Sequence, residues 1–231
     1  MKPTRIAVLG VYRSGSTAVA GALHHLGVDM GAPFFEGFYE SAELSKQLRR
    51  WWDEPRLVEK VAQAKRVRVL EQWIKEREAG GAKWVGMKHP LLSLCGEDLM
   101  QAWGPETRFI RCCRPLGDSI DSLKRLGRSV DGAFLQGTLM TALDRFFAGR
   151  EHLAIQFADL MSNPRREVER LMQYLGITAD EAHIAAAVGF IEPGKKSKVE
   201  TEQGEKIGAG EGYRPVRVWG AIRKIVAGRG K

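Results

Sequence analysis

The stretch Gly10-Val11-Tyr12-Arg13-Ser14-Gly15-Ser16-Thr17 decides the fold of this chain. It follows the apolar run Ile6–Leu9 and precedes a segment whose apolar residues share one helical face. A strand, a glycine-bearing turn and a helix in this order let backbone N–H groups surround a phosphate. The spacing matches a nucleotide phosphate loop, but Ser16 stands where ATP- and GTP-binding loops carry a lysine. The sequence therefore predicts a site for a phosphate-like group, with Arg13 as its cation.

The composition indicates an α/β domain with a basic surface. The chain has 231 residues, of which 44% are hydrophobic, and its 36 Lys and Arg against 28 Asp and Glu give a net charge of +8. A basic surface attracts nucleotides, nucleic acid, acidic glycans and lipid headgroups alike, so charge alone does not choose among them. Cys95, Cys112 and Cys113 have neither disulfide-framework nor metal-ligand spacing, and we expect a reducing cytoplasm. We also expect neither a signal peptide nor a transmembrane segment.

Apolar segments of strand length alternate with helical patterns along most of the chain. Strands are expected at 6–9, 84–87, 108–112 and 153–157. Helices are expected up to Gly27, over 41–52, from Pro55 to Gly80, over 118–127 and 133–149, from Pro164 to Gly176, and after the capping box Thr178–Glu181. This alternation predicts an α/β fold in which a parallel sheet is covered by helices on both faces.

We interpret residues 1–231 as a single domain. Between 190 and 215 Gly, Lys and Glu dominate and periodicity is lost, which is typical of a mobile loop, whether a functional lid or simple surface disorder. The pattern of residues 214–227 then predicts a basic terminal helix that is partly amphipathic.

A second motif follows the predicted strand at 108–112. Arg114 stands just after this strand, and Ser122 lies eight residues on, in the second turn of the next helix. Ligands of parallel sheets bind at the carboxyl ends of the strands. A guanidinium and a hydroxyl converging there suit a second phosphate.

Together the two motifs resemble those of the sulfotransferases that use 3′-phosphoadenosine 5′-phosphosulfate (PAPS). The first loop is close to the R-S-G-S/T-S/T form of bacterial members, and Arg114 with Ser122 reproduces the spacing of the family's 3′-phosphate motif, with Asp118 also matching. Two further segments are similar to family landmarks: Asp159-Leu160-Met161-Ser162-Asn163-Pro164 and Gly86-Met87-Lys88-His89-Pro90. The resemblance covers about residues 4–177. It implies a P-loop nucleotide-hydrolase-like three-layer sandwich and a PAPS co-substrate held by Tyr12, Arg13, Ser14, Gly15, Ser16, Thr17, Arg114 and Ser122.

The chain also departs from the family pattern. Eukaryotic cytosolic members have Lys where Arg13 stands and an aromatic residue where Ala18 stands, and many relatives have Asp in place of His89. The family's basic C-terminal loop has no clear counterpart. By composition alone, the candidates for it are Lys195, Lys196 and Lys198.

Sulfuryl transfer needs charge stabilisation and a general base for the acceptor. Arg13 is the expected electrophile. We place His89 first among the bases, since the charge of Lys88 would keep its imidazole neutral, with Glu40 second and Glu36 third. Both glutamates lie in an aromatic-rich loop over 30–40, a region where some glycan sulfotransferases carry their catalytic glutamate. The aromatic residues there, with Trp51 and Trp52, suit either a sugar-stacking platform or core, and we favour core.

Two other functions remain open from the sequence. One is a P-loop kinase or phosphotransferase, which the missing loop lysine disfavours. The other is a non-catalytic module that binds an anionic nucleotide, nucleic acid or a membrane surface.

We expect no metal, since no acidic residue clearly ends a strand to hold Mg²⁺. We expect the partners to be the nucleotide and a glycan, lipid or small-molecule acceptor bearing a hydroxyl or amine. Nucleic acid is not expected, peripheral membrane contact is compatible with the sequence, and the sequence specifies neither the acceptor nor the oligomeric state.

Overall fold

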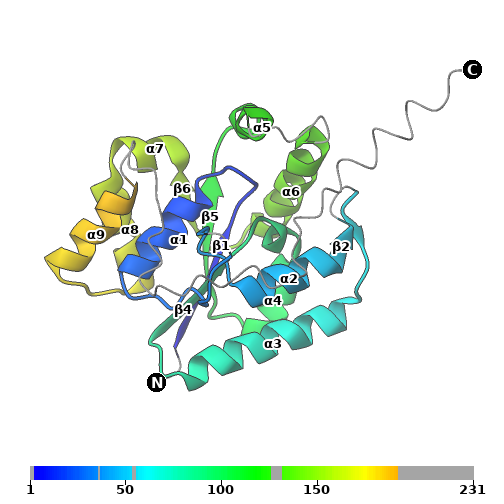
Figure 1. Ribbon diagram of the computed structural model, residues 1–231, viewed down its shortest axis with the longest axis horizontal. Helices are drawn as coiled ribbons and strands as arrows, with labels where there is room; N and C mark the ends of the chain where they lie inside the picture. The colour runs from blue at the N-terminus through cyan, green and yellow to red at the C-terminus, as the bar shows by residue number, and fades with distance from the viewer. Residues whose placement is uncertain (1–2, 36, 54–55, 126–131, 192–231) are drawn as a thin grey trace, which may run out of the picture. The chain divides into compact units, whose positions relative to one another are not determined.

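The computed structural model describes residues 3–35, 37–53, 56–125 and 132–191. These residues belong to one compact unit (Figure 1). The loop predicted at 190–215 and the helix predicted at 214–227 lie outside the described residues, apart from the first two positions of the loop. The interpretation of the whole chain as one domain therefore stays a prediction.

A four-stranded parallel sheet forms the centre of this unit, in the order β4-β1-β5-β6. Its strands are β1 (Thr4–Leu9), β4 (Trp84–Lys88), β5 (Arg108–Cys113) and β6 (Leu153–Gln156). Because β1 is flanked by β4 and β5, its carboxyl end, where the phosphate loop begins, lies at the middle of the sheet edge. This architecture confirms the predicted α/β class with a parallel sheet.

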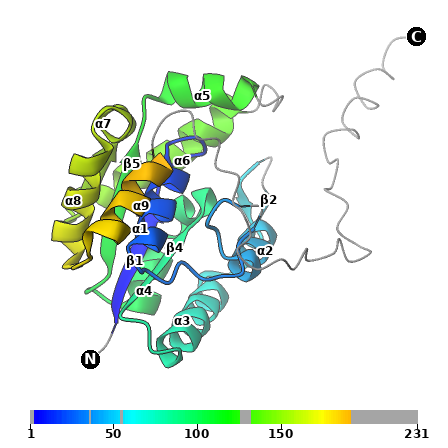
Figure 2. The ribbon, with the colours of Figure 1, turned by 60° about the vertical axis from the view of Figure 1, so that its left-hand side comes forward.

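Helices cover both faces of the sheet. They are α1 (Ser16–His25), α2 (Ala42–Trp51), α3 (Gln63–Ala79), α4 (Gly96–Trp103), α5 (Leu116–Arg125), α6 (Gly132–Phe147), α7 (Phe157–Ser162), α8 (Pro164–Leu175) and α9 (Glu181–Ile191), with a 3-10 turn η1 (Pro90–Leu94). One face carries α1, α8 and α9, and the other carries α3, α4 and α6 (Figure 1). Turning the molecule shows α9 lying against α1 (Figure 2).

Alternating strand residues supply the two apolar layers. Ala7 and Leu9 of β1 belong to one buried cluster with Val85 and Met87 of β4 and with apolar residues of α2, α3, α4 and α6. Ile6 and Val8 are equally buried and, by the two-residue period of a strand, point to the face that α1 covers. Both layers are needed because a parallel sheet buries both of its faces.

Several element boundaries differ from the sequence prediction. The helix expected from Pro55 begins at Gln63, and before it the short strands β2 (Trp52–Asp53) and β3 (Val58–Glu59) pair antiparallel. Buried Arg66 secures this hairpin through ion pairs with Glu59 at 2.5 Å and Asp98 at 2.6 Å. These tertiary contacts override the helical pattern of the sequence.

The segment between β4 and β5 forms η1 and α4, neither of which was predicted. Two other boundaries also differ. Residue 157, expected as strand, begins α7. The cap before α9 is Asp180 rather than Thr178, because the Asp180 carboxylate accepts the backbone N–H of His183 at 2.9 Å.

The close contact between α1 and α9 predicts the effect of a side chain at Gly21. A Cβ added there would lie 2.1 Å from Cε1 of Phe190. We expect Gly21→Ala to lower the free energy of unfolding by about 1–3 kcal/mol in urea denaturation. Gly137→Ala on α6 is the matched control, because its Cβ would meet nothing within 4 Å, and we expect it to stabilise by about 0.5–1 kcal/mol. Equal stability of Gly21→Ala and wild type would contradict this packing.

Candidate functional site

The phosphate loop joins β1 to α1 with an unusual backbone. Gly15 is the N-cap of α1 with φ of 91°, and Arg13 has φ of 63°. A left-handed φ is uncommon for a residue other than glycine and is found where the surrounding structure over-determines it. A Cβ at Gly10 would lie 2.5 Å from Ser14 Oγ, and one at Gly15 would lie 2.6 Å from the Phe157 ring. Both positions therefore need glycine, and the resulting loop leads into the N-terminus of α1, where backbone N–H groups bind anions.

Two buried side chains hold the loop from outside. Gln136 of α6 is fully buried, and its amide group donates to the Tyr12 carbonyl at 2.7 Å and accepts the Tyr12 N–H at 3.0 Å. Ser93 of η1 donates to the Gly10 carbonyl at 3.2 Å. We did not single out either residue from the sequence. The available signal was a glutamine beside the apolar stripe of α6, because a buried amide requires partners.

Arg13, Ser122 and Arg114 come together at the carboxyl ends of β1 and β5. Arg13 Nε donates to Ser122 Oγ at 3.0 Å, and Arg114 Nη1 donates to the Arg13 carbonyl at 3.0 Å. The Arg114 guanidinium also lies over the Phe157 ring, 4.2 Å from its centroid. The α5 helix, which carries Ser122, lies above the same end of the sheet as the phosphate loop (Figure 1). The eight-residue spacing thus does place both side chains beside the loop.

Two polar atoms in this region are buried without a hydrogen-bond partner among the described residues. They are Ser14 Oγ and Arg114 Nε. A buried donor without a partner costs about 1–3 kcal/mol. The site is therefore better suited to an anion that accepts these hydrogen bonds than to an empty state.

A second polar cluster lies at the carboxyl end of β4. Lys88 Nζ donates to Thr17 Oγ1 of α1 at 3.0 Å and to Glu40 Oε1 at 2.5 Å. His89 follows Lys88, and its Nε2 lies 3.6 Å from Glu40 Oε2. Lys88, Glu40 and His89 are all buried. The cluster therefore joins the phosphate loop to the loop over 30–40 through one buried ammonium group.

The geometry of His89 disagrees with its predicted role as the first-choice base. Its Nδ1 accepts the backbone N–H of Leu91 at 3.1 Å, so in the neutral ring the hydrogen resides on Nε2. Burial lowers the pKa of His89 well below 6.5, and the charges of Lys88 and Arg49 lower it further. The Glu40 carboxylate at 3.6 Å does not reverse this direction. In this arrangement the neutral imidazole has no free lone pair for an acceptor's proton, and the order of the candidate bases stays a prediction.

The third candidate base, Glu36, lies outside the described residues. The aromatic residues predicted as a platform or as core are all described. Tyr39, Trp51 and Trp52 are buried, in line with the core interpretation. Phe38 instead has 39% of its surface exposed, and the centroid of its ring lies 6.0 Å from Lys88 Nζ. This partly exposed ring therefore lies beside the buried Lys88–Glu40 cluster.

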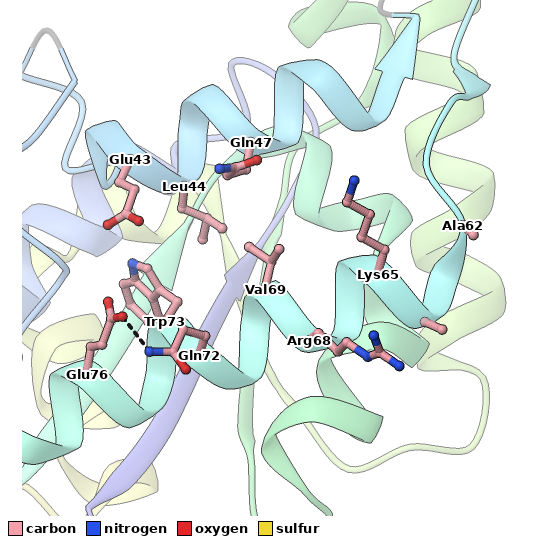
Figure 3. Close-up of a pocket in the computed structure, with 11 residues that line it drawn as sticks. Glu43, Leu44, Gln47, Ala62, Lys65, Arg68, Val69, Gln72, Trp73 and Glu76 are labelled. Carbon is pink, nitrogen blue, oxygen red and sulfur yellow. Dashed lines mark hydrogen bonds between the residues drawn. The ribbon is translucent and has the colours of Figure 1, made fainter.

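A separate groove of about 650 Å³ lies between α2 and α3 (Figure 3). Trp73 and Val69 lie at its middle, with Glu43 and Glu76 toward one end and Lys65 and Arg68 toward the other (Figure 3). Its lining includes no residue of the phosphate loop or of the Lys88–Glu40 cluster. The groove is therefore not part of the candidate site.

No group of three or more His, Cys, Asp and Glu side chains among the described residues could hold a metal ion. Within the same residues, no helix has the length and apolar character needed to cross a membrane.

Comparisons with known proteins point to one family. The model of the sulfotransferase family matches residues 3–181. The solved sulfotransferase domain of the Synechococcus PCC 7002 olefin synthase is similar, with 20% identity, coverage of 79% of this chain and 76% of that chain, and a TM-score of 0.50. A sulfotransferase of Mycobacterium tuberculosis is 16% identical, with coverages of 82% and 71% and a TM-score of 0.52.

A sugar kinase from Janibacter is also similar, at 16% identity, with coverage of 76% of this chain and 96% of that chain and a TM-score of 0.50. At such identities the structural likeness shows the P-loop-like fold alone, and the family assignment rests on the sequence model. A search of curated proteins finds no match.

The lowered pKa of His89 predicts a pH dependence of stability. Above pH 6.5, its ordinary pKa, the imidazole is neutral in both the folded and the unfolded chain. Below this value the unfolded chain binds a proton that the folded chain does not, so the free energy of unfolding decreases. We expect His89→Gln to lose this part of the slope in urea titrations between about pH 7.5 and pH 5. Parallel slopes for wild type and variant would show that His89 titrates normally in the folded chain.

Proposed function

Because the chain belongs to the sulfotransferase family, we propose that it transfers a sulfuryl group from PAPS to a hydroxyl or amine acceptor. The observation that carries this proposal is the meeting of two groups of donors, which we interpret as two anion sites side by side. One is the phosphate loop, and the other is formed by Arg114 and Ser122, which meet the loop through Arg13. A nucleotide with phosphate groups on both its 5′ and 3′ sides fits this pair.

The nucleotide would use donors that the protein already orients. Loop N–H groups and the unpartnered Ser14 hydroxyl suit the 5′-phosphosulfate. Arg114 suits the 3′-phosphate, since its Nε is a buried donor without a partner among the described residues. The Phe157 ring beneath this guanidinium limits its rotation, so less side-chain entropy is lost on binding.

In the proposed reaction the acceptor oxygen forms a bond to sulfur while the bond from sulfur to the 5′-phosphate oxygen breaks. Adenosine 3′,5′-bisphosphate leaves with the electron pair of that bond, and the acceptor's proton passes to a base. Arg13 of the loop and Lys88, which donates to Thr17, supply positive charge for the departing phosphate oxygens.

Glu40 is the base that the geometry favours. Lys88 binds its Oε1, whereas Oε2 has no hydrogen bond to a described residue and lies 3.6 Å from His89 Nε2. Oε2 therefore keeps a lone pair for the acceptor's proton. Lys88 also contacts Thr17, so the base and the phosphate loop share one cation and are held in a constant relation to each other.

The kinase alternative has support from fold alone, through the sugar kinase likeness. The loop lysine that reaches the outer phosphates of a triphosphate is replaced by Ser16.

We infer cytoplasmic location from the three cysteines, all of them free.

The paired anion sites predict the nucleotide preference. We expect adenosine 3′,5′-bisphosphate to bind more tightly than AMP or ATP in calorimetry, and Arg114→Ala to weaken it by about 2–4 kcal/mol. Arg108→Ala is the matched control, because Arg108 begins the strand that Arg114 follows and lies at the opposite end of the sheet. Equal affinity for AMP and the bisphosphate would exclude a 3′-phosphate site.

If Glu40 is the base, replacing it should impair sulfuryl transfer far more than nucleotide binding. Glu40→Gln should lower the turnover of sulfuryl transfer by about 10²–10⁴-fold, because the amide cannot take the acceptor's proton. The bisphosphate should still bind, because the phosphate loop, Arg114 and Ser122 are unaltered. Transfer is measured with radiolabelled PAPS and a panel of sugar, lipid and phenolic alcohols. Glu43→Gln, an exposed glutamate one turn later, is the control. Retained turnover in Glu40→Gln together with lost turnover in His89→Gln would restore His89 as the base.

A further inference from the structure

Three exposed side chains of α2 near the candidate site are basic. Lys46, Arg49 and Arg50 are exposed and spaced three and four residues apart, so they are neighbours on one helix surface. Among the described residues no carboxylate forms an ion pair with any of the three. Most such surface charges contribute little individually, so a specific role needs a side chain that the structure holds in position.

Arg49 is held in this way. Its guanidinium carbon lies 4.6 Å from the centroid of the Phe35 ring, within the range of a cation–π contact. The neighbouring Arg50 has no such contact among the described residues. A planar guanidinium stacked on a ring retains its outward N–H donors for a carboxylate or phosphate.

Phe35 in turn is tied to Glu40. Phe34 and Ser41 form an antiparallel bridge, and Phe35 N–H donates to the Glu40 carbonyl at 2.7 Å. Phe35 and Glu40 are therefore joined through the backbone, one position beyond the isolated Phe34–Ser41 bridge. Arg49 thus stands over the aromatic neighbour of the proposed base.

The charges around Glu40 favour an anion. Arg49 and Lys88 both lower the pKa of His89, so the fields of α2 and of the cluster reach the same point. The exposed Phe38 ring adds an apolar surface beside Lys88. Within the described residues, Glu40 is the sole carboxylate that contacts Lys88 or His89, and its charge is offset by Lys88.

We propose that Arg49, held on the Phe35 ring, is an anion subsite for the acceptor, so that the sulfated molecule carries a carboxylate, phosphate or sulfate near its reacting group. This inference rests on the proposed function. The anionic group belongs either to an acidic sugar or to a phospholipid headgroup, which share this chemistry.

The test compares neutral and anionic probes on the full chain loaded with adenosine 3′,5′-bisphosphate. Methyl β-D-glucuronide against methyl β-D-glucoside represents the sugar source. Vesicles of phosphatidylglycerol against phosphatidylcholine represent the lipid source. We expect the wild type to bind the anionic member of at least one pair about tenfold more tightly, and Arg49→Gln to remove this preference.

Arg50→Gln is the matched control, because it removes the same charge from the same helix without touching Phe35. It should retain the preference within about twofold, since an exposed unpaired charge contributes little. Absence of anion preference in both pairs would overturn the subsite. Equal losses in the two variants would overturn it too, since they would indicate a general field of α2.

Failure of the proposed function gives a different result. In that case the bisphosphate does not bind and no labelled sulfuryl group is transferred. The anion preference can still be measured on the nucleotide-free protein, with the same two variants. A preference that depends on Arg49 without bisphosphate binding would keep the subsite and reject the sulfotransferase reaction.

Discussion

The buried ammonium group of Lys88 is the interaction on which the rest of the site depends. Lys88 ends β4 in register with Val8 of β1, so its side chain starts beside the phosphate loop. A buried charge is costly unless it is paired and hydrogen-bonded. Glu40 and Thr17 meet this requirement, and they come from the loop over 30–40 and from the first turn of α1, which follows the phosphate loop. Removing either partner would leave the charge under-compensated, so the loop over 30–40 and the phosphate loop are each constrained by the same cation.

The phosphate loop is supported by a second set of contacts that does not involve charge. Gln136 fixes the peptide groups of Tyr12 in both directions, and Ser93 fixes the carbonyl of Gly10. Both supports come from elements on the far side of the loop from α1. The left-handed conformation of Arg13 persists because its flanking residues are held in this way. A conformation that is prepared before the ligand arrives lowers the cost of ordering the loop on binding.

The sequence predicted the parts of the site that depend on local geometry. Short-range rules are enough to predict the phosphate loop, the strand–helix order and the spacing from Arg114 to Ser122. The hydrogen bond that occupies the His89 Nδ1 lone pair was not foreseen, because it comes from a backbone N–H two residues later, in an unpredicted 3-10 turn. Gln136 was missed because its partner lies 124 residues away. The start of α3 was misplaced because buried ion pairs of Arg66 stabilise a hairpin in place of the first helical turns.

The distribution of charge divides the site into two halves with different requirements. Arg13 and Arg114 stand where a bound nucleotide would concentrate negative charge, whereas Glu40 stands where an acceptor would lose a proton. Lys88 joins the two halves, because its Nζ donates both to Thr17 Oγ1 beside the phosphate loop and to Glu40 Oε1. A displacement of either loop would therefore be transmitted to the other through one buried side chain.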